Sequence, residues 1–406
     1  MNQAALRPLR WLLSCLSLWA AAPALALTAG APIALPTQAF EQHEAAVAFG
    51  GGVYLVVWQS EDGSRADIYG ARLSSEGALL DASPLALSTA VERQKRPRVS
   101  FSNGVFLVVW EDLRSGVDYD VYGCRVRPDG TVLDPAGIAI ATGERNQAQP
   151  DVAGGPDRFV VVHQRSVTRG YVPEASVVGT NGAIERAPQL LYPLPSGGGI
   201  VPGSQVRVSF ADDGYLVAYN GAWTRSLNGD FKISGQRLAA DATPVDALPF
   251  DVSNPSQRIY YPNVAPGPSG WLVVWEDIRE RGENGFAGSA TRVAFDGTVV
   301  DADPNQLTFG INGRKTYHNT VAHDGTRWVV AFVEPVDDRQ NDRLYWKLVS
   351  RVITVDGDDS GDDTLVAEDA GWPTLASDGS GKALLVYTQM ATVNGERMKV
   401  VARFLE

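Results

Sequence analysis

A short phrase made of an aromatic residue, three aliphatic residues and a further aromatic residue recurs seven times along the chain. The first two copies are Tyr54–Trp58 and Phe106–Trp110, and the last residues of successive copies lie 52 to 57 positions apart. A repeat of about 40–50 residues built from short strands is typical of a propeller blade. The repeat therefore constrains the architecture, although it carries no information about activity. The remaining copies, some of them degenerate, end at His163, Tyr219, Trp275, Phe332 and Tyr387.

Each repeat predicts four antiparallel strands, as the second copy illustrates. A first strand at Pro97–Phe101 precedes the phrase Phe106–Trp110, whose dense apolar run suits a strand covered on both faces. A third strand follows at Asp120–Val126, and the turn Pro128–Gly130 uses glycine where a positive φ is needed. The fourth strand is Gly137–Ile140. Four antiparallel strands per repeat make one blade.

The two ends of the chain predict how the ring closes. The last copy stops after its third strand, Met398–Leu405, and leaves no sequence for a fourth. The segment Gly30–Leu35 matches the fourth-strand segment Ser83–Leu87, so we expect it to complete the last blade and to cover an exposed edge. The sequence thus predicts an all-β fold with one domain, a seven-bladed β-propeller of four-stranded blades over residues 27–406.

Residues 1–26 have the features of a secretory signal peptide. Arg7 and Arg10 precede an apolar core at Trp11–Ala22, and Ala24–Ala26 forms a small-x-small cleavage site. Cys15 gives a weaker indication of a lipoprotein signal, because most of the apolar core follows it. We therefore expect a secreted or periplasmic protein, with no membrane insertion after the signal is removed.

The charge of the chain limits its partners. The formal net charge is −12 at pH 7, which argues against nucleic acid or an anionic membrane surface as a partner. An acidic protein accommodates neutral or cationic ligands such as sugars. We expect a monomer that binds a carbohydrate or an extracellular protein.

Two motifs give a family resemblance. The segment Trp110-Glu-Asp-Leu-Arg114, followed by Asp120-Val-Tyr-Gly123, resembles the repeats of secreted bacterial propeller proteins of the TolB-like and sialidase-like kind. The resemblance covers essentially all of residues 27–406 and implies the propeller architecture. It implies no catalytic residue, because sialidases carry Ser-x-Asp-x-Gly-x-x-Trp loops and this sequence contains none.

An arginine recurs in the third strand of most repeats. One interpretation is a basic ring that binds an anionic ligand. The interpretation that we favour is structural: each arginine pairs with a carboxylate on the neighbouring second strand or loop, such as Glu111, Asp112, Glu276 or Asp277. The column comprises Arg72, Arg125, Arg237, Arg292, Arg351 and Arg403, with Ser176 in the third repeat.

Residues that differ between repeats are the better candidates for function. The loops that lead into the first strands should meet near the central channel, with the loops between second and third strands beside them. Exposed aromatic residues next to polar groups suit sugar rings or peptide side chains. An alternative is that these loops are merely solvated. The candidate ligand-binding residues are His43, Glu44, Arg96, Tyr260, Tyr261, Tyr317, His318, Trp372, Trp223 and Trp346.

One acidic segment, residues 356–363, resembles a calcium-binding loop. Asp356, Asp358, Ser360 and Asp362 are oxygen donors at alternate positions, as in such loops. The terminal bidentate glutamate is missing, and other repeats have a simple turn here. We therefore favour a solvated acidic turn, and we expect no cofactor other than this possible calcium.

The sequence contains no nucleophile elbow, no HExxH motif, no phosphate loop and no metal-spaced Cys/His cluster. We therefore favour an exported, non-catalytic propeller that binds a carbohydrate or a protein at the loop face around the central funnel. The alternative is a carbohydrate-active enzyme, a glycoside hydrolase or a polysaccharide lyase, that uses the same funnel. A lyase would use a tyrosine or histidine base, and Tyr261, Tyr317 and His318 are candidates.

Overall fold

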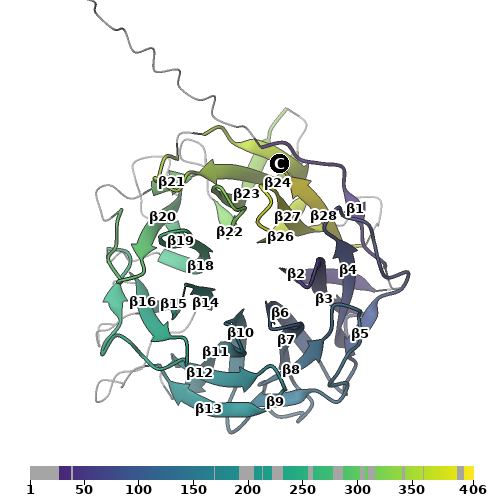
Figure 1. The fold of residues 1–406 in the computed structure, drawn as a ribbon. Helices are drawn as coiled ribbons and strands as arrows, with labels where there is room; N and C mark the ends of the chain where they lie inside the picture. Colours follow the sequence, from purple (N-terminus) through teal and green to yellow (C-terminus); the bar gives the residue numbers. More distant parts are fainter. Residues whose placement is uncertain are drawn as a thin grey trace, which may run out of the picture.

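The computed structural model contains seven four-stranded antiparallel sheets arranged in a ring around an open centre (Figure 1). These sheets are the seven predicted blades, numbered here along the chain, and the described residues form no helix. In particular, no helix of the described part has the length and apolar character needed to cross a bilayer. The structure describes residues 27–37, 40–168, 170–191, 205–212, 214–221, 232–254, 259–277, 287–301, 307–309, 316–340, 343–359, 361–390 and 397–406.

Each of the first four blades is built from four consecutive strands, with the first strand nearest the channel (Figure 1). Blade 1 has β2 (Glu41–Gly50), β3 (Val53–Glu61), β4 (Ala66–Ser74) and β5 (Leu85–Ser88). Blade 2 has β6 (Gln94–Ser102), β7 (Val105–Asp112), β8 (Asp120–Val126) and β9 (Ile138–Ala141). Blade 3 has β10 (Gln147–Gly154), β11 (Arg158–Val167), β12 (Gly170–Gly179) and β13 (Ile184–Leu190). Blade 4 has β14 (Val206–Ala211), β15 (Gly214–Gly221), β16 (Lys232–Ala239) and β17 (Phe250–Asp251).

The last three blades follow the same plan, except that the outer strand of blade 7 comes from the N-terminal end. Blade 5 has β18 (Ile259–Gly267), β19 (Gly270–Asp277), β20 (Ala287–Ala294) and β21 (Leu307–Phe309). Blade 6 has β22 (Tyr317–His323), β23 (Trp328–Asp338), β24 (Arg343–Ile353) and β25 (Thr364–Glu368). Blade 7 has β26 (Ala370–Ser377), β27 (Ala383–Gln389), β28 (Lys399–Leu405) and β1 (Ile33–Ala34).

The predicted closure of the ring is confirmed. Strand β1 pairs antiparallel with β28, with Ile33 opposite Ala402. The backbone N–H of Gly30 donates to the carbonyl of Phe404 at 2.9 Å, which extends the contact towards the N-terminus. The edge of β28 is therefore covered, and this edge is no longer available for pairing with another chain.

The repeated phrase is the core of every blade because its alternate side chains serve two different interfaces. Val56 of β3 packs with Leu384 of blade 7, whereas the next residue, Val57, packs with Val108 of blade 2. This alternation follows from the two-residue period of a strand. Trp58 has no exposed surface, and burial of a large apolar side chain contributes about 1.5–3 kcal/mol.

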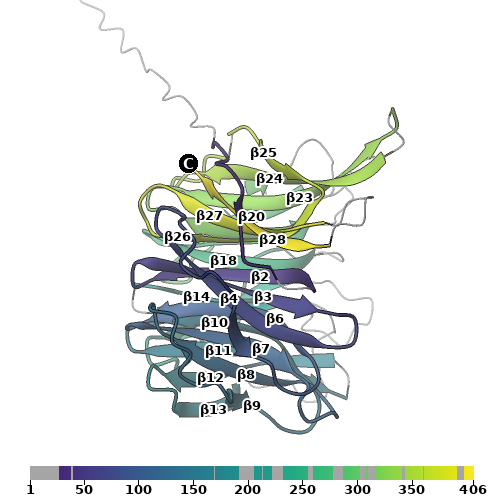
Figure 2. The same cartoon turned by 90° about the vertical axis from the view of Figure 1, so that its right-hand side faces the viewer.

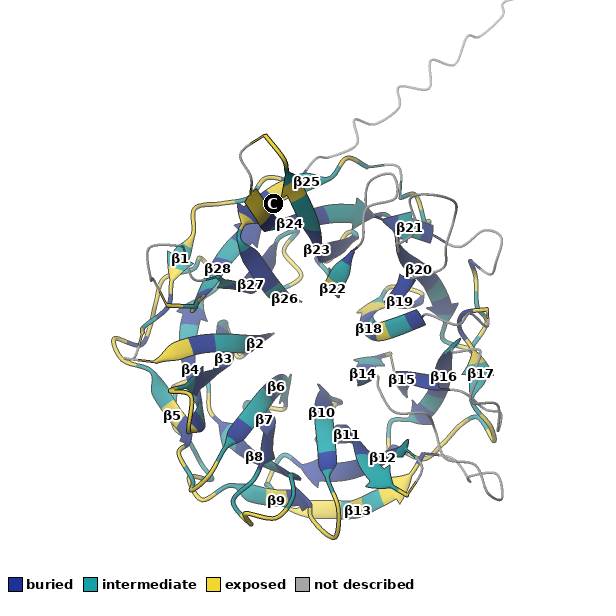
Figure 3. Cartoon of the chain, turned by 180° about the vertical axis from the view of Figure 1, so that it is seen from behind, coloured by how far each residue is buried: buried dark blue, intermediate teal, exposed yellow. Residues whose placement is uncertain are grey.

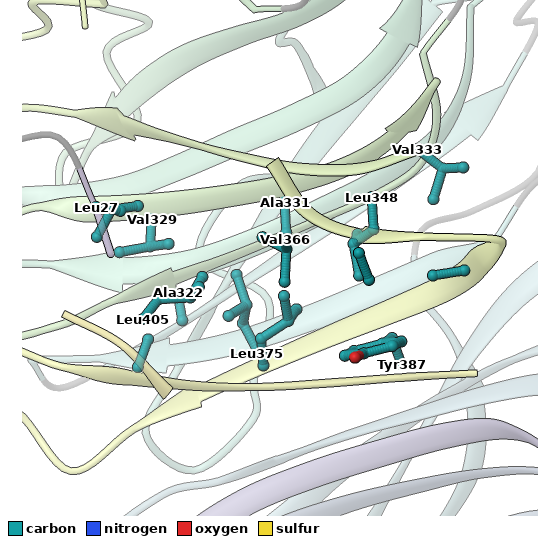
Figure 4. Packing of buried hydrophobic residues seen from close by; sticks show 14 residues of the cluster. Leu27, Ala322, Val329, Ala331, Val333, Leu348, Val366, Leu375, Tyr387 and Leu405 are labelled. Carbon is teal, nitrogen blue, oxygen red and sulfur yellow. The ribbon is translucent and has the colours of Figure 1, made fainter. Parts of the chain in front are cut away.

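The interface between blades 6 and 7 shows this packing at close range (Figure 4). Val329, Ala331 and Val333 project from β23 towards Leu375 and Tyr387 of blade 7 (Figure 4). Burial is greatest in the second strands, such as β3 and β7, whereas β13 at the rim is largely exposed (Figure 3). The β23–β24 hairpin is longer than the others and projects from the ring (Figure 2).

The recurring arginine joins one blade to the next. Arg125 forms a two-pronged ion pair with Asp134, at 2.8 Å from Nε and 2.8 Å from Nη2, and its Nη1 donates to the carbonyl of Thr180 in blade 3 at 3.1 Å. The turn of the next blade that each arginine contacts leaves little space around the guanidinium. A Cβ added to Gly130, which has a φ of +90°, would lie 2.9 Å from the guanidinium carbon of Arg72. The same clamp joins blades 1 and 2 (Arg72 to Pro128), 4 and 5 (Arg237 to Phe295) and 5 and 6 (Arg292 to Val355).

The structural interpretation of the arginine column is therefore confirmed for the five arginines that pair with a carboxylate, Arg72, Arg125, Arg237, Arg292 and Arg351, but the partners that the sequence suggested are wrong. For the first four, the carboxylates are Asp81, Asp134, Asp246 and Asp301, each nine residues after its arginine across the tight turn. Glu111, Asp112, Glu276 and Asp277 lie at the end of the second strands, where they make other contacts. The tight turn returns the chain antiparallel beside the third strand, which is why the nearby aspartate meets the arginine.

Blade 3 replaces the clamp with a different arginine. Ser176 occupies the arginine position of β12 and is fully buried. Arg186 of β13 instead donates from Nη1 to the carbonyl of Ala242 in blade 4, at 2.8 Å, and from Nη2 to that of Asp241. Blades 3 and 4 are thus joined by an arginine as well, but this arginine lies on the fourth strand of the blade and not on the third.

We expect Arg125→Leu to lower the free energy of unfolding by about 1–3 kcal/mol, because it leaves Asp134 unpaired and removes the bond to blade 3. Arg339 is the matched control, since its ion pair with Asp337 is exposed, with 88% of the arginine side chain accessible. Arg339→Leu should change the stability by less than about 0.5 kcal/mol. Urea denaturation of both variants measures the difference, and equal stabilities would contradict the clamp.

Candidate functional site

The first strands of all seven blades surround a cavity of about 430 Å³ in the central channel. Its size falls within the range of ordinary ligand pockets. Seven residues, one from each blade, form its upper ring, which we call the bulge ring: Glu44, Arg96, Gln149, Gln205, Tyr261, His318 and Trp372. No two neighbouring blades present the same side chain except blades 3 and 4, which both present glutamine.

The bulge ring owes its position to an irregularity in the first strands. In six blades the pairing with the second strand shifts at this point, as between Tyr260 and Asn263 in β18. The ring residues of these six blades have positive φ angles, between 48° and 54°. A β-bulge of this kind bends the strand and re-aims a side chain, and the left-handed conformation costs about 1–2 kcal/mol per residue. Strained backbone of this kind is typical of functional sites.

The preceding blade holds several of these bulges in place. The residue after the core phrase accepts a hydrogen bond from the backbone N–H of the bulge residue in the next blade. Glu111 Oε1 accepts from Gln149 and Glu276 Oε1 from His318, both at 2.7 Å, and Gln59 Oε1 accepts from Arg96 at 3.4 Å. These three bulges are therefore fixed by the blade beside them.

Glu111 and Glu276 occupy equivalent places but have different electrostatic surroundings. Glu111 is paired with Arg96, whose Nη1 lies 3.1 Å from its Oε1. Glu276 is 3% exposed, and no cation of the described residues lies within 4.0 Å of it. Burial raises the pKa of Glu276 to about 7, against the opposing hydrogen bond from His318.

The bulge ring has an aromatic side, formed by three successive blades. Tyr261, His318 and Trp372 come from blades 5, 6 and 7, and Tyr261 is 40% exposed. The rings of His318 and Trp372 have centroids 5.5 Å apart, at an angle of 44°. Burial lowers the pKa of His318, with the charge of Glu44 acting in the opposite sense, so the imidazole is mainly neutral at pH 7.

The other side of the bulge ring is polar. Arg96 extends between two carboxylates, with its Nε 3.8 Å from Glu44 Oε2 and its Nη1 on Glu111. Gln149 and Gln205 continue this side across blades 3 and 4. The cavity therefore offers flat apolar faces on one wall and hydrogen-bonding groups on the opposite wall.

A second ring lies two residues further along each first strand, and we call it the floor. It is charged in blades 2, 3 and 4, with Arg98, Asp151 and Arg207, all of which line the cavity. The other blades contribute uncharged residues here, namely Ala46, Asn263, Thr320 and Thr374. The floor thus carries a net positive charge in blades 2 to 4, the same blades that form the polar side of the bulge ring.

Five of the ten ligand-binding residues predicted from the sequence line the cavity: Glu44, Arg96, Tyr261, His318 and Trp372. The others do not line it, or lie outside the described residues as Trp223 does. His43 contacts Glu61, with Nε2 3.2 Å from Oε2, and Tyr260 packs on Tyr261. Tyr317 packs edge-on against Trp346, with centroids 5.5 Å apart. Their roles in binding stay predictions.

Sequence reasoning missed the three charged residues of the floor. Arg98 and Asp151 lie inside predicted first strands, and strand residues were assigned to blade packing. One signal was present: two positions after each bulge residue, four blades have alanine, asparagine or threonine, whereas three have a charge. Comparison of the repeats at that offset would have identified Arg98, Asp151 and Arg207.

The predicted calcium loop is described except for Ser360. Asp358 lies in a tight turn, where its backbone N–H donates to Thr354 Oγ1 at 2.9 Å. Asp359 accepts from the backbone of Thr308, and Asp363 pairs with Arg351, so these two acids serve the contacts of blade 6. No group of three potential metal ligands occurs within the described ranges. Calcium binding by Asp356, Asp358, Ser360 and Asp362 stays a prediction.

Comparison with known proteins gives a fold but no family. No protein-family profile and no curated protein sequence matches the chain. A protein of unknown function from Dyadobacter fermentans has a TM-score of 0.53 at 11% identity, over 95% of this chain and all of the other. The polysaccharide lyase Uly1 has a TM-score of 0.52 at 8% identity, over 89% of each chain. A mutant Trypanosoma rangeli sialidase has a TM-score of 0.44 at 11% identity, over 93% of this chain and 59% of the other, too low to carry an argument.

At these identities the likeness shows the propeller fold alone. The predicted propeller architecture agrees with the first two neighbours, while the TolB-like and sialidase-like resemblance stays a prediction.

We expect Glu276→Gln to become more stable relative to the wild type as the pH rises. Glu276 keeps its proton up to about pH 7 when folded but loses it near 4.5 when unfolded, so the wild type loses stability between these values. Glutamine still accepts the N–H of His318 and carries no charge. Urea denaturation should show that the free energy of unfolding of Glu276→Gln, relative to that of the wild type, rises by about 1–3 kcal/mol between pH 5 and pH 8.

The matched control is Glu111→Gln, which breaks the ion pair with Arg96 and should be less stable than the wild type at pH 8. A difference between Glu276→Gln and the wild type that does not vary with pH would contradict the assignment.

Proposed function

We propose that this propeller binds a carbohydrate in the central cavity and does not catalyse a reaction on it. The observation that supports the proposal most strongly is the composition of the bulge ring. Tyr261, His318 and Trp372 offer aromatic surface on one wall, and Arg96, Gln149 and Gln205 offer hydrogen-bonding groups on the other. A sugar ring has apolar faces and a polar edge, and therefore matches such a pair of walls.

The structural neighbours are consistent with this proposal. The polysaccharide lyase Uly1 has a similar fold over most of its length, and its name refers to a carbohydrate polymer. The shared fold gives no information about residues or activity in this chain. It supports only the view that a propeller of this kind can accommodate a carbohydrate.

The alternative is a carbohydrate-active enzyme that uses the same cavity. The observation in its favour is the perturbed pair at the boundary of blades 5 and 6, where Glu276 has a raised pKa beside His318. Against it, the Glu276 carboxylate is committed to the N–H of His318 and does not line the cavity. The equivalent Glu111 makes the same bond to Gln149, which gives both glutamates a structural explanation. We therefore favour binding.

We also infer that the chain is exported, to the periplasm or out of the cell, and acts there as a monomer. Residues 1–26 support this inference, since their charged, apolar and small-residue regions follow the order of a signal peptide. An extracellular protein remains the second class of ligand for the same face.

We expect the wild-type chain to bind a subset of a glycan array, and we expect Tyr261→Ala/Trp372→Ala to lower the affinity for that glycan at least tenfold. The double variant removes both outer aromatic faces of the wall, while the hydrogen bond that holds the bulge of His318 between them remains. Isothermal titration calorimetry with the glycan found on the array measures the change. Phe40→Ala is the control, because Phe40 is an exposed aromatic residue outside the cavity.

Unchanged affinity in the double variant would contradict the site. Turnover of a polysaccharide, detected as new reducing ends or as unsaturated uronate absorbance and abolished by His318→Ala, would favour the enzyme. Absence of any glycan binding, together with capture of an extracellular protein by the wild type only, would favour the protein ligand.

A further inference from the structure

The floor of the cavity contains two arginines that no carboxylate neutralises directly. Arg98 Nη1 donates to the carbonyl of Pro97 at 2.8 Å, and Arg207 Nη1 donates to that of Val206 at 3.0 Å. Arg207 Nη2 donates to Gln205 Oε1. All of these acceptors are neutral. Among the residues that the structure describes, no carboxylate oxygen lies within 4.0 Å of either guanidinium, in contrast to the arginines of the blade clamps.

Asp151 lies on the blade between them and is itself engaged elsewhere. Its Oδ2 accepts the backbone N–H of Val208 at 2.9 Å, which ties the carboxylate to blade 4. Asp151 is 9% exposed and Arg207 is 7% exposed, so both charges are largely withdrawn from water. Within the floor itself two cations and one anion leave an excess of one positive charge, and the bulge ring adds one charge of each sign with Glu44 and Arg96.

This arrangement is electrostatically costly without a further anion. Burial lowers the pKa of Arg207 to about 10, and the charge of Arg98 acts in the same direction, whereas the charges of Asp151 and Glu44 act in the opposite direction. A desolvated guanidinium is stabilised most by a hydrogen-bonded carboxylate, which the planar donor group of arginine fits. The whole chain carries a charge of −12. Inside the channel, however, low-dielectric walls concentrate the positive field of the two floor arginines.

We propose that Arg98 and Arg207 form a subsite for the carboxylate of an acidic sugar, with the sugar ring against Tyr261, His318 and Trp372. The inference rests on the proposed carbohydrate function and names the ligand class as a uronate-bearing oligosaccharide. Both groups of residues line one cavity, from blades 2 and 4 on one side and blades 5 to 7 on the other. The net acidity of the chain led us to expect neutral or cationic ligands, and the local charge of the floor reverses that expectation.

The test compares two probes that differ at one group, which is a charged carboxylate in one and its neutral methyl ester in the other. Oligogalacturonate and its fully methyl-esterified form are titrated into the full chain by calorimetry, at low and at high salt. The acid should bind at least tenfold more tightly than the ester, and the preference should shrink with salt, because one charged hydrogen-bonding contact discriminates by about ten- to a hundredfold.

Three single-residue variants test the roles of Arg98, Arg207 and Asp151. Arg207→Gln and Arg98→Gln should each abolish most of the preference for the acid, while binding of the ester changes little. Asp151→Asn should increase the affinity for the acid several-fold, since it removes the competing negative charge and keeps an oxygen for the N–H of Val208. Arg339→Gln, on the exposed β23–β24 hairpin, is the control. Melting temperatures of all variants separate loss of folding from loss of binding. Destabilisation could not produce the tighter binding of the acid that is expected for Asp151→Asn.

The outcomes separate the two proposals. Equal affinity of the wild type for acid and ester, or acid affinity unaffected by both arginine variants, would overturn the anion subsite and leave the carbohydrate function standing. Binding of free acetate that depends on Arg207, without binding of either oligosaccharide, would keep an anion site and overturn its assignment to a sugar.

Discussion

Closure of the ring is the constraint on which the rest of this structure depends. Each blade is a sheet with two apolar faces, so it is stable only when a neighbour covers each face. The second strands meet this requirement with alternate side chains, as Val56 and Val57 do for blades 7 and 2. The arginine clamps add a directional contact at the rim, where burial is incomplete. Strand β1 then completes blade 7, so that the C-terminal part of the ring is held by the N-terminal part.

The same closure separates the residues that maintain the fold from those that are free to differ. Seven first strands converge on the channel, and a bulge in six of them directs one side chain per blade into a common cavity. The backbone hydrogen bonds that fix a bulge come from the preceding blade, through residues such as Glu111 and Glu276. These hydrogen bonds involve the backbone of the bulge residue and not its side chain. This independence explains why glutamate, arginine, glutamine, tyrosine, histidine and tryptophan occupy equivalent positions.

Much of the fold could be predicted from the sequence because its determinants are local and repeated. The phrase ending at Trp58 predicts the second strand, and the glycine turns predict the third and fourth. His163 ends its copy of the phrase where others end in tryptophan; it likewise has no exposed surface, and its Nε2 lies 3.3 Å from Glu174 Oε2. The partner of Arg125 was predicted wrongly, because Asp134 reaches it only after the turn reverses the chain. The site was predictable in part: loop position identified Tyr261 and Trp372, whereas Arg98 and Arg207 lie within strands whose side chains resemble packing residues in sequence.

The most direct test of this account is a crystal structure of the chain with a bound uronate oligosaccharide. The account predicts that the carboxylate lies within hydrogen-bonding distance of both Arg98 and Arg207, and that a sugar ring contacts Trp372 or Tyr261. An oligosaccharide bound at the rim of the blades, or one in the channel with its carboxylate directed away from both arginines, would contradict it.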